Sequence, residues 1–386
     1  MDIIKSKKLF ELGCFHLAHF LHYPLISPRI LQLSFINRCN LSCKMCSVGR
    51  YATSQTEELS PQELEEIITK ALRHFKIREL IITGGEPLLA PESVLKIAGL
   101  AKRNNLRAIL TTNGILLAQY APLLATSGIT HFHISLDGLK NTHNALRNNP
   151  AAFDKTKDAV RCLAELRRKH NYNYSIGLAA VILKTNIDEL YELFELGDVL
   201  GADILDLFAY LPDNTDFSHP PDTDLWPQTE DMVKFIQIYK KIKNAKTRNI
   251  KLNPNFDVNR IIKYYTKTLQ RGDWKCFAGY KNFFITMSDP NEQGRYEPCL
   301  FMCKTQIPLR DFGFDLKKIW YSRKVYKARR QISMCRQYCY QACFSLPGFK
   351  ECLKSGPATM AHSVAATQEA ELVLQKARMG NEYVGK

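Results

Sequence analysis

The sequence predicts an α/β fold built on a parallel sheet, because six short apolar runs alternate with six helical segments. Strands that are buried on both faces appear as continuous apolar runs, which is typical of parallel sheets covered by helices. Periodicity alone does not distinguish a barrel from an open doubly wound sheet, and in either case ligands bind at the carboxyl ends of the strands. The apolar runs are 31–37, 79–83, 107–112, 131–136, 175–183 and 204–210. The helical segments lie near 61–75, 91–104, 116–126, 152–169, 187–200 and 230–244.

The first of these helices begins with residues that can cap it. In Ser60-Pro61-Gln62-Glu63, the serine suits the N-cap and the proline suits the first helical position. The glutamate stands three residues after the serine, where its side chain can bond back to the cap. This pattern predicts a sharply defined helix start at Pro61.

Residues 1–29 form a strongly apolar segment whose periodicity predicts a helix ending at Pro24. Such a helix either packs on the rest of the fold or lies on a membrane surface with Lys5, Lys7 and Lys8 at the headgroups. Packing is the commoner arrangement, so we expect it and keep membrane contact as the alternative. We recognise no secretory signal, because histidines interrupt the apolar run and no small-residue cleavage site follows.

The composition is that of a globular chain with an uneven distribution of charge. The 386 residues allow one large domain or two ordinary ones, and no apolar stretch is long enough to cross a bilayer. Twelve cysteines without an export signal indicate metal ligands in a reducing, cytoplasmic location rather than a disulfide framework. The net charge of +15 arises in the C-terminal third, where residues 240–351 hold 24 Lys and Arg against 8 Asp and Glu. Such a basic region suits an anionic partner, and a plain solvated surface is the equally weighted alternative.

Three cysteines in one loop, Cys39, Cys43 and Cys46, carry the strongest chemical signal. They follow the first apolar run with the spacing C-x3-C-x2-C. Cysteine thiolates are the usual ligands of iron–sulfur clusters, and a four-iron cluster usually takes four of them. Three close ligands therefore leave one iron open to chelate a small molecule. A structural zinc site is disfavoured, because such sites pair C-x2-C knuckles with a fourth ligand and only Cys14 and nearby histidines are at hand.

This spacing resembles the signature of the radical S-adenosylmethionine (radical SAM) enzymes, and a second motif supports the resemblance. Gly84-Gly85-Glu86-Pro87 directly follows the second apolar run, one strand–helix unit after the cysteines. The resemblance covers about residues 30–245 and implies a partial (β/α)6 TIM-like barrel. It also implies a [4Fe–4S] cluster held by Cys39, Cys43 and Cys46, whose open iron takes the amino and carboxylate groups of S-adenosylmethionine. An electron donor such as a flavodoxin or ferredoxin is implied as a partner.

Polar residues follow the next two apolar runs, as Thr112-Asn113-Gly114 and as Ser135-Leu136-Asp137-Gly138. Short polar side chains can bind ribose hydroxyls or a carboxylate, and the guanidinium fork of Arg147 can pair with a planar carboxylate. His143 precedes Arg147 in the pattern S-L-D-G…H-x3-R and is expected to cap or orient. The resemblance implies that S-adenosylmethionine is bound by Gly84, Gly85, Glu86, Pro87, Asn113, Ser135, Asp137 and Arg147.

Seven further cysteines follow the barrel region in a layout that resembles the SPASM and twitch extensions of radical SAM enzymes. Two short apolar runs, 283–286 and 295–297, predict a hairpin bracketed by two of them. Seven are too few to ligate two four-iron clusters fully, so we expect one auxiliary cluster; two clusters, one with an open iron, is the alternative. Cysteines that are merely packed in a core are the remaining interpretation. The resemblance implies an auxiliary [4Fe–4S] cluster on four of the five residues Cys276, Cys299, Cys335, Cys339 and Cys343.

We therefore expect an apolar N-terminal segment (1–29), a radical SAM core (30–245), a small cysteine-rich auxiliary-cluster domain (246–354) and a tail (355–386). The implied function is reductive cleavage of S-adenosylmethionine to a 5′-deoxyadenosyl radical that abstracts a substrate hydrogen. The net reaction would be an oxidation or a crosslink assisted by the auxiliary cluster, on a peptide or protein or on an anionic small molecule. The alternative is a non-catalytic iron–sulfur protein that transfers electrons or senses redox state. Modification of nucleic acid rests on charge alone and is disfavoured.

Overall fold

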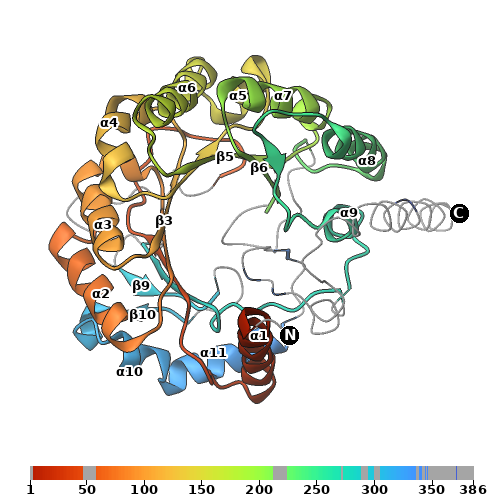
Figure 1. Ribbon diagram of the computed structural model, residues 1–386. Helices are drawn as coiled ribbons and strands as arrows, with labels where there is room; N and C mark the ends of the chain where they lie inside the picture. The colour runs from red at the N-terminus through yellow and green to blue at the C-terminus, as the bar shows by residue number, and fades with distance from the viewer. Residues whose placement is uncertain are drawn as a thin grey trace, which may run out of the picture.

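A curved, largely parallel sheet lies inside an arc of helices in the computed structural model of this protein (Figure 1). Among the described helices, none combines the length and apolar composition needed to cross a bilayer. The structure describes residues 3–46, 58–211, 224–270, 273–287, 294–299, 305–335, 339–340, 344, 346 and 371, with side chains from residue 9 onward.

Ten strands form the sheet, in the order β10-β9-β8-β1-β2-β3-β4-β5-β6-β7. Strands β1 to β7 run parallel to their neighbours, and β8 pairs parallel with β1 on its other side. Strands β9 and β10 are added antiparallel beyond β8. The six predicted strands are confirmed as β1 (Ile30–Ser34), β2 (Glu79–Thr83), β3 (Arg107–Thr112), β4 (His131–Ser135), β5 (Ser175–Ile182) and β6 (Ile204–Ala209). The others are β7 (Lys251–Leu252), β8 (Asn282–Thr286), β9 (Arg295–Tyr296) and β10 (Ile307–Pro308).

The six predicted helices are also confirmed and cover the outer face of the sheet (Figure 1). The capping box at the first of them is present: Glu63 N donates to Ser60 Oγ at 3.2 Å, and Ser60 N donates to Glu63 Oε2 at 2.9 Å. These helices are α2 (Pro61–His74), α3 (Pro91–Arg103), α4 (Leu117–Ser127), α6 (Ala152–His170), α7 (Leu190–Leu200) and α8 (Thr229–Asn244). Shorter 3-10 turns are η3 (Pro87–Leu89), η4 (Ile187–Glu189) and η5 (Arg310–Phe312).

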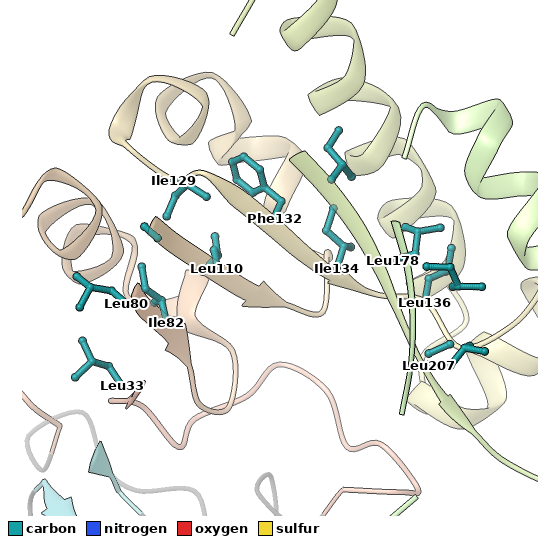
Figure 2. Close-up of a cluster of buried hydrophobic side chains, with 14 of the residues drawn as sticks. Leu33, Leu80, Ile82, Leu110, Ile129, Phe132, Ile134, Leu136, Leu178 and Leu207 are labelled. Carbon is teal, nitrogen blue, oxygen red and sulfur yellow. The ribbon is translucent and has the colours of Figure 1, made fainter. Parts of the chain in front are cut away.

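The main core lies between the sheet and these helices. Alternate strand residues such as Leu33, Leu80, Leu110 and Phe132 are fully or almost fully buried in one apolar cluster with helix side chains (Figure 2). Because successive side chains of a strand point to opposite faces, the intervening residues face the inside of the curved sheet. The inside of the arc is therefore lined by a different set of side chains, several of them polar.

The predicted N-terminal helix and C-terminal hairpin are both confirmed. Helix α1 (Ile3–Leu21) packs through Phe15 and Ala18 on Phe277 and Tyr280. Strands β8 and β9 pair antiparallel as predicted, and β8 joins the sheet beside β1. The C-terminal part of the chain thus continues the sheet of the barrel. Helix α9 (Val258–Tyr265) precedes β8 in the chain, and α10 (Leu316–Trp320) and α11 (Arg323–Ser333) follow β10.

One helix near the strand ends is not predicted from the sequence. Helix α5 (Lys140–Arg147) is short, and its start is held by a residue far along the chain. Glu189 accepts hydrogen bonds from Leu139 N at 2.7 Å and from Thr142 Oγ1 at 2.6 Å. A cap supplied from another element leaves no local pattern, which explains why the helix was not expected. The suggested helix at 365–377 and most of the loop at 213–227 lie outside the described residues.

Candidate functional site

The cysteine loop follows β1 and is tied to the end of α5. Cys39, Cys43 and Cys46 are each half-buried. Cys46 N donates to Cys43 O at 3.2 Å, and Lys44 N donates to Leu146 O at 2.9 Å. These bonds fix the loop in a tight turn at the carboxyl edge of the sheet, where ligands are expected.

The two glycines of the second motif press directly against this loop. Gly85 N donates to Ile36 O at 2.6 Å, and Glu86 N donates to Arg38 O at 2.9 Å. A Cβ on Gly85 would lie 2.2 Å from Arg38 O, and one on Gly84, where φ is +142°, would lie 2.2 Å from Ile36 O. Only glycine allows two backbones to approach this closely. The motif therefore shapes the cysteine loop, whatever contact it also makes with a ligand.

Glu86 is fully buried and its carboxylate is occupied by protein donors. It accepts from Leu88 N at 3.0 Å, from Thr112 Oγ1 at 2.7 Å and from Asn113 N at 2.8 Å. Burial raises the pKa of Glu86 and these hydrogen bonds oppose the rise. Pro87, also buried, begins η3 immediately after it. In this geometry Glu86 joins the end of β2 to the end of β3, and its predicted contact with S-adenosylmethionine stays a prediction.

Asn113 connects the end of β3 to the cysteine loop. Its Nδ2 donates to Asn40 Oδ1 at 2.7 Å and lies 3.9 Å from the sulfur of Cys39. Its Oδ1 accepts from Ile115 N at 3.0 Å, so both ends of the amide are used. An N–H group aimed at a cysteine sulfur stabilises the thiolate form and tunes a bound cluster.

Asp137 and Arg147 form a buried pair beside the cysteine loop. Asp137 is fully buried, and its Oδ2 contacts Arg147 Nε at 2.7 Å and Nη2 at 2.5 Å. The remaining guanidinium nitrogen, Nη1, lies 3.7 Å from the sulfur of Cys43. Burial opposes the charge on Arg147, but Asp137 and Cys43 outweigh it and raise the pKa of the guanidinium. Arg147 thus presents one N–H edge to the loop while Asp137 holds the other.

The other side of Asp137 is also fixed by hydrogen bonds. Its main-chain N donates to His143 Nδ1 at 3.1 Å, which places the ring proton of neutral His143 on Nε2. Burial lowers the pKa of His143 to about 4, so the ring is neutral at pH 7. Asn186 Nδ2 donates to Asp137 O at 2.6 Å and to Val181 O at 2.7 Å. The expectation that His143 orients its neighbours agrees with these contacts, and Asn186 has a similar role.

Ser135, the last residue of β4, is half-buried on the inner face of the sheet. Within the described part of the chain its hydroxyl makes no hydrogen bond, unlike the side chains of Asn113 and Asp137. A hydroxyl without a protein partner at a strand end is available to a ligand.

The donor set fits an iron–sulfur cluster. Burial raises the pKa of the Cys39 thiol to about 11, and burial raises that of Cys43 although Arg147 opposes it. A bound cation deprotonates such thiols and removes this penalty. Among the described residues, no three His, Cys, Asp or Glu side chains are grouped so that they could hold a single metal ion. A four-iron cluster does not need such a group, because each cysteine ligand binds a different iron.

Of the C-terminal cysteines, Cys276 and Cys299 are brought to the same place. Both pack against the apolar cluster of Ala278, Ile332 and Phe344. Cys335 follows α11, and its N donates to Ile332 O at 3.1 Å. Ile332 belongs to the same apolar cluster, so the backbone of Cys335 lies next to it. Cys339 is half-buried, and Cys343 lies outside the described residues.

Sequence reasoning missed a polar pair on the inner face of the sheet. His133 Nε2 on β4 stands 3.2 Å from Asp206 Oδ2 on β6, and Asp206 Oδ1 accepts from Asn253. Burial opposes the charge on Asp206, but His133 and Asn253 hold its pKa below the ordinary value. The available signal was the run His131, His133 and Ser135, which places three polar side chains on one face of a buried strand.

Comparison with known proteins gives a family and a fold. Residues 33–197 match the family model of the Radical SAM superfamily. The chain is 31% identical over 202 residues to the AdoMet-dependent heme synthase of Methanosarcina barkeri, covering 51% of this chain and 56% of that protein. It is 30% identical over 189 residues to the probable GTP 3′,8-cyclase of Methanocaldococcus jannaschii, covering 48% and 59%. The chain spans little more than half the length of these curated relatives.

Two solved structures share the fold at low sequence identity. Streptococcus suis SuiB aligns with a TM-score of 0.61 at 17% identity, covering 86% of this chain and 74% of SuiB. The enzyme anSMEcpe, with bound AdoMet and the Cp18Cys peptide, aligns with a TM-score of 0.58 at 18% identity, covering 92% and 99%. Both alignments extend well beyond residues 33–197, so the likeness in fold includes part of the C-terminal region.

Proposed function

This chain belongs to the radical SAM superfamily, whose members use a [4Fe–4S] cluster and S-adenosylmethionine, and we propose that it is a radical enzyme acting at the strand-end site. When bound, the cluster would supply one electron that breaks a carbon–sulfur bond of S-adenosylmethionine, giving methionine and a 5′-deoxyadenosyl radical. That radical would take a hydrogen atom from the substrate. The observation that carries the proposal is the convergence of Cys39, Cys43 and Cys46 with Gly85, Asn113 and Arg147 at one edge of the sheet.

In this proposal each strand end has a distinct task. Gly84 and Gly85 hold the cysteine loop close to β2, and Glu86 and Pro87 fix the turn that follows. Arg147, held by Asp137, offers its Nη1 edge to the methionine carboxylate next to the loop. The hydroxyl of Ser135 would bind a polar group of the nucleoside, and Asn113, whose amide bonds to Asn40 and Ile115, would line the site beside Cys39.

We further propose one auxiliary [4Fe–4S] cluster in the C-terminal region. Cys276 and Cys299 would be two ligands, because both pack on one apolar cluster. Two of Cys335, Cys339 and Cys343 would complete the set, and two auxiliary clusters are the alternative. The auxiliary cluster would accept the electron that a substrate radical loses as it also releases a proton, which makes the net reaction an oxidation or a crosslink. An external donor such as a flavodoxin or ferredoxin would reduce the first cluster, and a membrane surface would be a further partner, contacted through the N-terminal segment.

The substrate class is proposed as a peptide or a small molecule. The solved structures that share the fold include SuiB bound to its precursor peptide SuiA and anSMEcpe bound to a peptide. The curated relatives are named for the synthesis of heme and of a cyclised GTP. Inside the sheet, His133 and Asp206 form a polar pair that suits a substrate hydroxyl, thiol or ammonium group.

A non-catalytic electron carrier is the competing function, and cofactor cleavage separates the two. The full chain would be reconstituted anaerobically with iron and sulfide, and 5′-deoxyadenosine formed with dithionite would be quantified. We expect cleavage in the wild type and none in a Cys39→Ala, Cys43→Ala, Cys46→Ala triple variant. A reconstituted wild type that neither binds nor cleaves S-adenosylmethionine would favour the electron carrier.

A further inference from the structure

Helix α1 is apolar on two faces, only one of which is covered. Its inner face packs on Phe277 and Tyr280 through buried side chains. Its outer face exposes large apolar side chains with the spacing of a single helical stripe. The exposed fractions of these outer residues are 75% for Phe10, 50% for Leu17, 77% for Phe20 and 46% for Leu21. An exposed apolar patch of this kind marks a surface that contacts a protein or a membrane.

Helix α11 exposes a basic face that lacks counter-ions. Arg323, Lys324, Lys327 and Arg330 are all exposed, and none forms a salt bridge with another described residue. The stretch 316–335, which contains both α10 and α11, includes no Asp or Glu. The positive field of this face is therefore not balanced locally.

The structure places the two helices side by side. The Nδ1 atom of His22, just after α1, lies 2.9 Å from the Oγ atom of Ser333 at the end of α11. The rings of Tyr23 and Tyr321 meet with centroids 6.1 Å apart, and both rings are partly exposed. Figure 1 shows α1 and α11 in contact on one side of the molecule. Segments some 300 residues apart in the sequence thus lie next to each other. We call their exposed side chains the α1–α11 surface: Phe10, Leu17, Phe20 and Leu21 from α1, and Arg323, Lys324, Lys327 and Arg330 from α11.

We propose that the α1–α11 surface docks on anionic lipid headgroups. Apolar side chains beside unpaired Lys and Arg, with tyrosines between them, are what an interfacial helix presents to a charged membrane. The inference does not depend on the proposed function, since none of these side chains belongs to the cysteine loop or the strand ends.

Vesicle flotation tests the proposal with the reconstituted full chain under anaerobic conditions. We expect the wild type to bind vesicles of equal phosphatidylglycerol and phosphatidylcholine and to bind phosphatidylcholine alone at least tenfold more weakly. The variant F20E/L21E removes the apolar contact and should weaken binding to the anionic vesicles more than tenfold. The variant K324E/K327E should weaken it about 25-fold or more, because each basic residue near such a surface contributes about fivefold.

Two matched controls keep the test specific. Leu123 on α4 and Val199 on α7, 57% and 84% exposed, give L123E/V199E, which makes the same number of apolar-to-acidic changes as F20E/L21E elsewhere. Arg168 and Lys169, exposed at the end of α6, give R168E/K169E with the same change in net charge as K324E/K327E. Both controls should bind within twofold of the wild type. In a Phe20→Trp variant, the tryptophan emission should shift to the blue on addition of anionic vesicles.

Three results would overturn the proposal. The first is wild-type chain that stays unbound to anionic vesicles at low salt. The second is R168E/K169E that loses as much binding as K324E/K327E, which would reduce the effect to net charge. The third is a wild type that self-associates in sedimentation velocity, with F20E/L21E monomeric and no vesicle binding by either. That outcome would assign the surface to a second copy of the chain.

Discussion

The strand-end site and the C-terminal cysteine region are both signalled by cysteine spacing, yet the structure builds them differently. At the strand ends, backbone and side-chain hydrogen bonds join the cysteine loop to β2, β3 and α5. In the C-terminal region, Cys276 and Cys299 come together by apolar packing on Ala278, Ile332 and Phe344. Directional hydrogen bonds position the first set, and packing on a small hydrophobic cluster contributes to the position of Cys276 and Cys299.

This difference predicts how each set of cysteines responds to substitution of the residues around it. Directional bonds and close backbone approaches fail when a single atom is added or removed, because the groups left behind are buried and unpaired. A small apolar cluster loses stability gradually as volume is removed. We therefore expect the strand-end site to respond sharply to conservative changes and the C-terminal region to depend on its metal ligands.

The largest effect is expected from Gly85→Ala. The added Cβ would lie 2.2 Å from Arg38 O and 2.6 Å from Asn37 O, so the cysteine loop must move. A displacement of about 1 Å at a reacting centre can cost about a hundredfold in rate, and we expect at least that loss of 5′-deoxyadenosine formation. The control is Gly99→Ala, where the nearest atom is 3.6 Å away. Retention of full activity by G85A would contradict the role given to the close backbone approach.

Next in size is the effect of Arg147→Met on stability. The change leaves the fully buried carboxylate of Asp137 without its cation, which costs about 3–5 kcal/mol in free energy of unfolding. Arg161→Met is the matched control, because Arg161 pairs with the exposed Asp158 at 3.4 Å and such pairs contribute less than about 1 kcal/mol. Urea denaturation at pH 7 measures both variants. Equal losses would mean that the buried pair is no stronger than a surface pair.

A smaller effect is expected from the pH dependence of stability. The pKa of His143 falls from its usual 6.5 to about 4 in the folded chain, so between these values the unfolded chain binds more protons. Stability contributed by neutral His143 is therefore present above about pH 6.5 and is lost as the pH falls toward 4. His143→Gln removes this titration and should reduce the loss of unfolding free energy between pH 7 and 5 by about 2 kcal/mol. An unchanged slope against pH in H143Q would count against this assignment.

The smallest effect on cleavage of S-adenosylmethionine is expected from the double variant C276A/C299A. This double variant should lose about four irons per chain and keep dithionite-driven formation of 5′-deoxyadenosine within about twofold. The reason is that separate contacts hold the two cysteine sets. Substitutions at independent sites have additive effects, so losing one set should leave the chemistry of the other nearly unchanged. A double variant with unchanged iron content would make Cys276 and Cys299 packing residues only.

Much of the barrel could be predicted from the sequence because its signals are local. Each strand is an apolar run, and the start of α2 carries its own capping box. The hairpin of β8 and β9 was likewise readable from two runs. The pairing of β8 with β1 could not be predicted, because the register between strands so far apart in the sequence depends on the whole fold.

The site was predicted in its residues more than in its contacts. Glu86 and Arg147 were expected to meet a ligand, and in the structure each is bonded to partners on other elements, Thr112 and Asp137. The pairing of His133 with Asp206 requires knowing which strands share an inner face. Contacts of this kind form between residues distant in sequence, so no local pattern announces them.

The central claim is that Cys39, Cys43 and Cys46 hold a cluster with one iron open to S-adenosylmethionine. The most direct test is electron paramagnetic resonance of the reduced C276A/C299A variant, which should carry about four irons in that single cluster. The account predicts that adding S-adenosylmethionine changes the spectrum, and that further alanine substitution of the three cysteines removes both iron and signal. A spectrum that S-adenosylmethionine leaves unchanged, from a cluster that is otherwise intact, would contradict it.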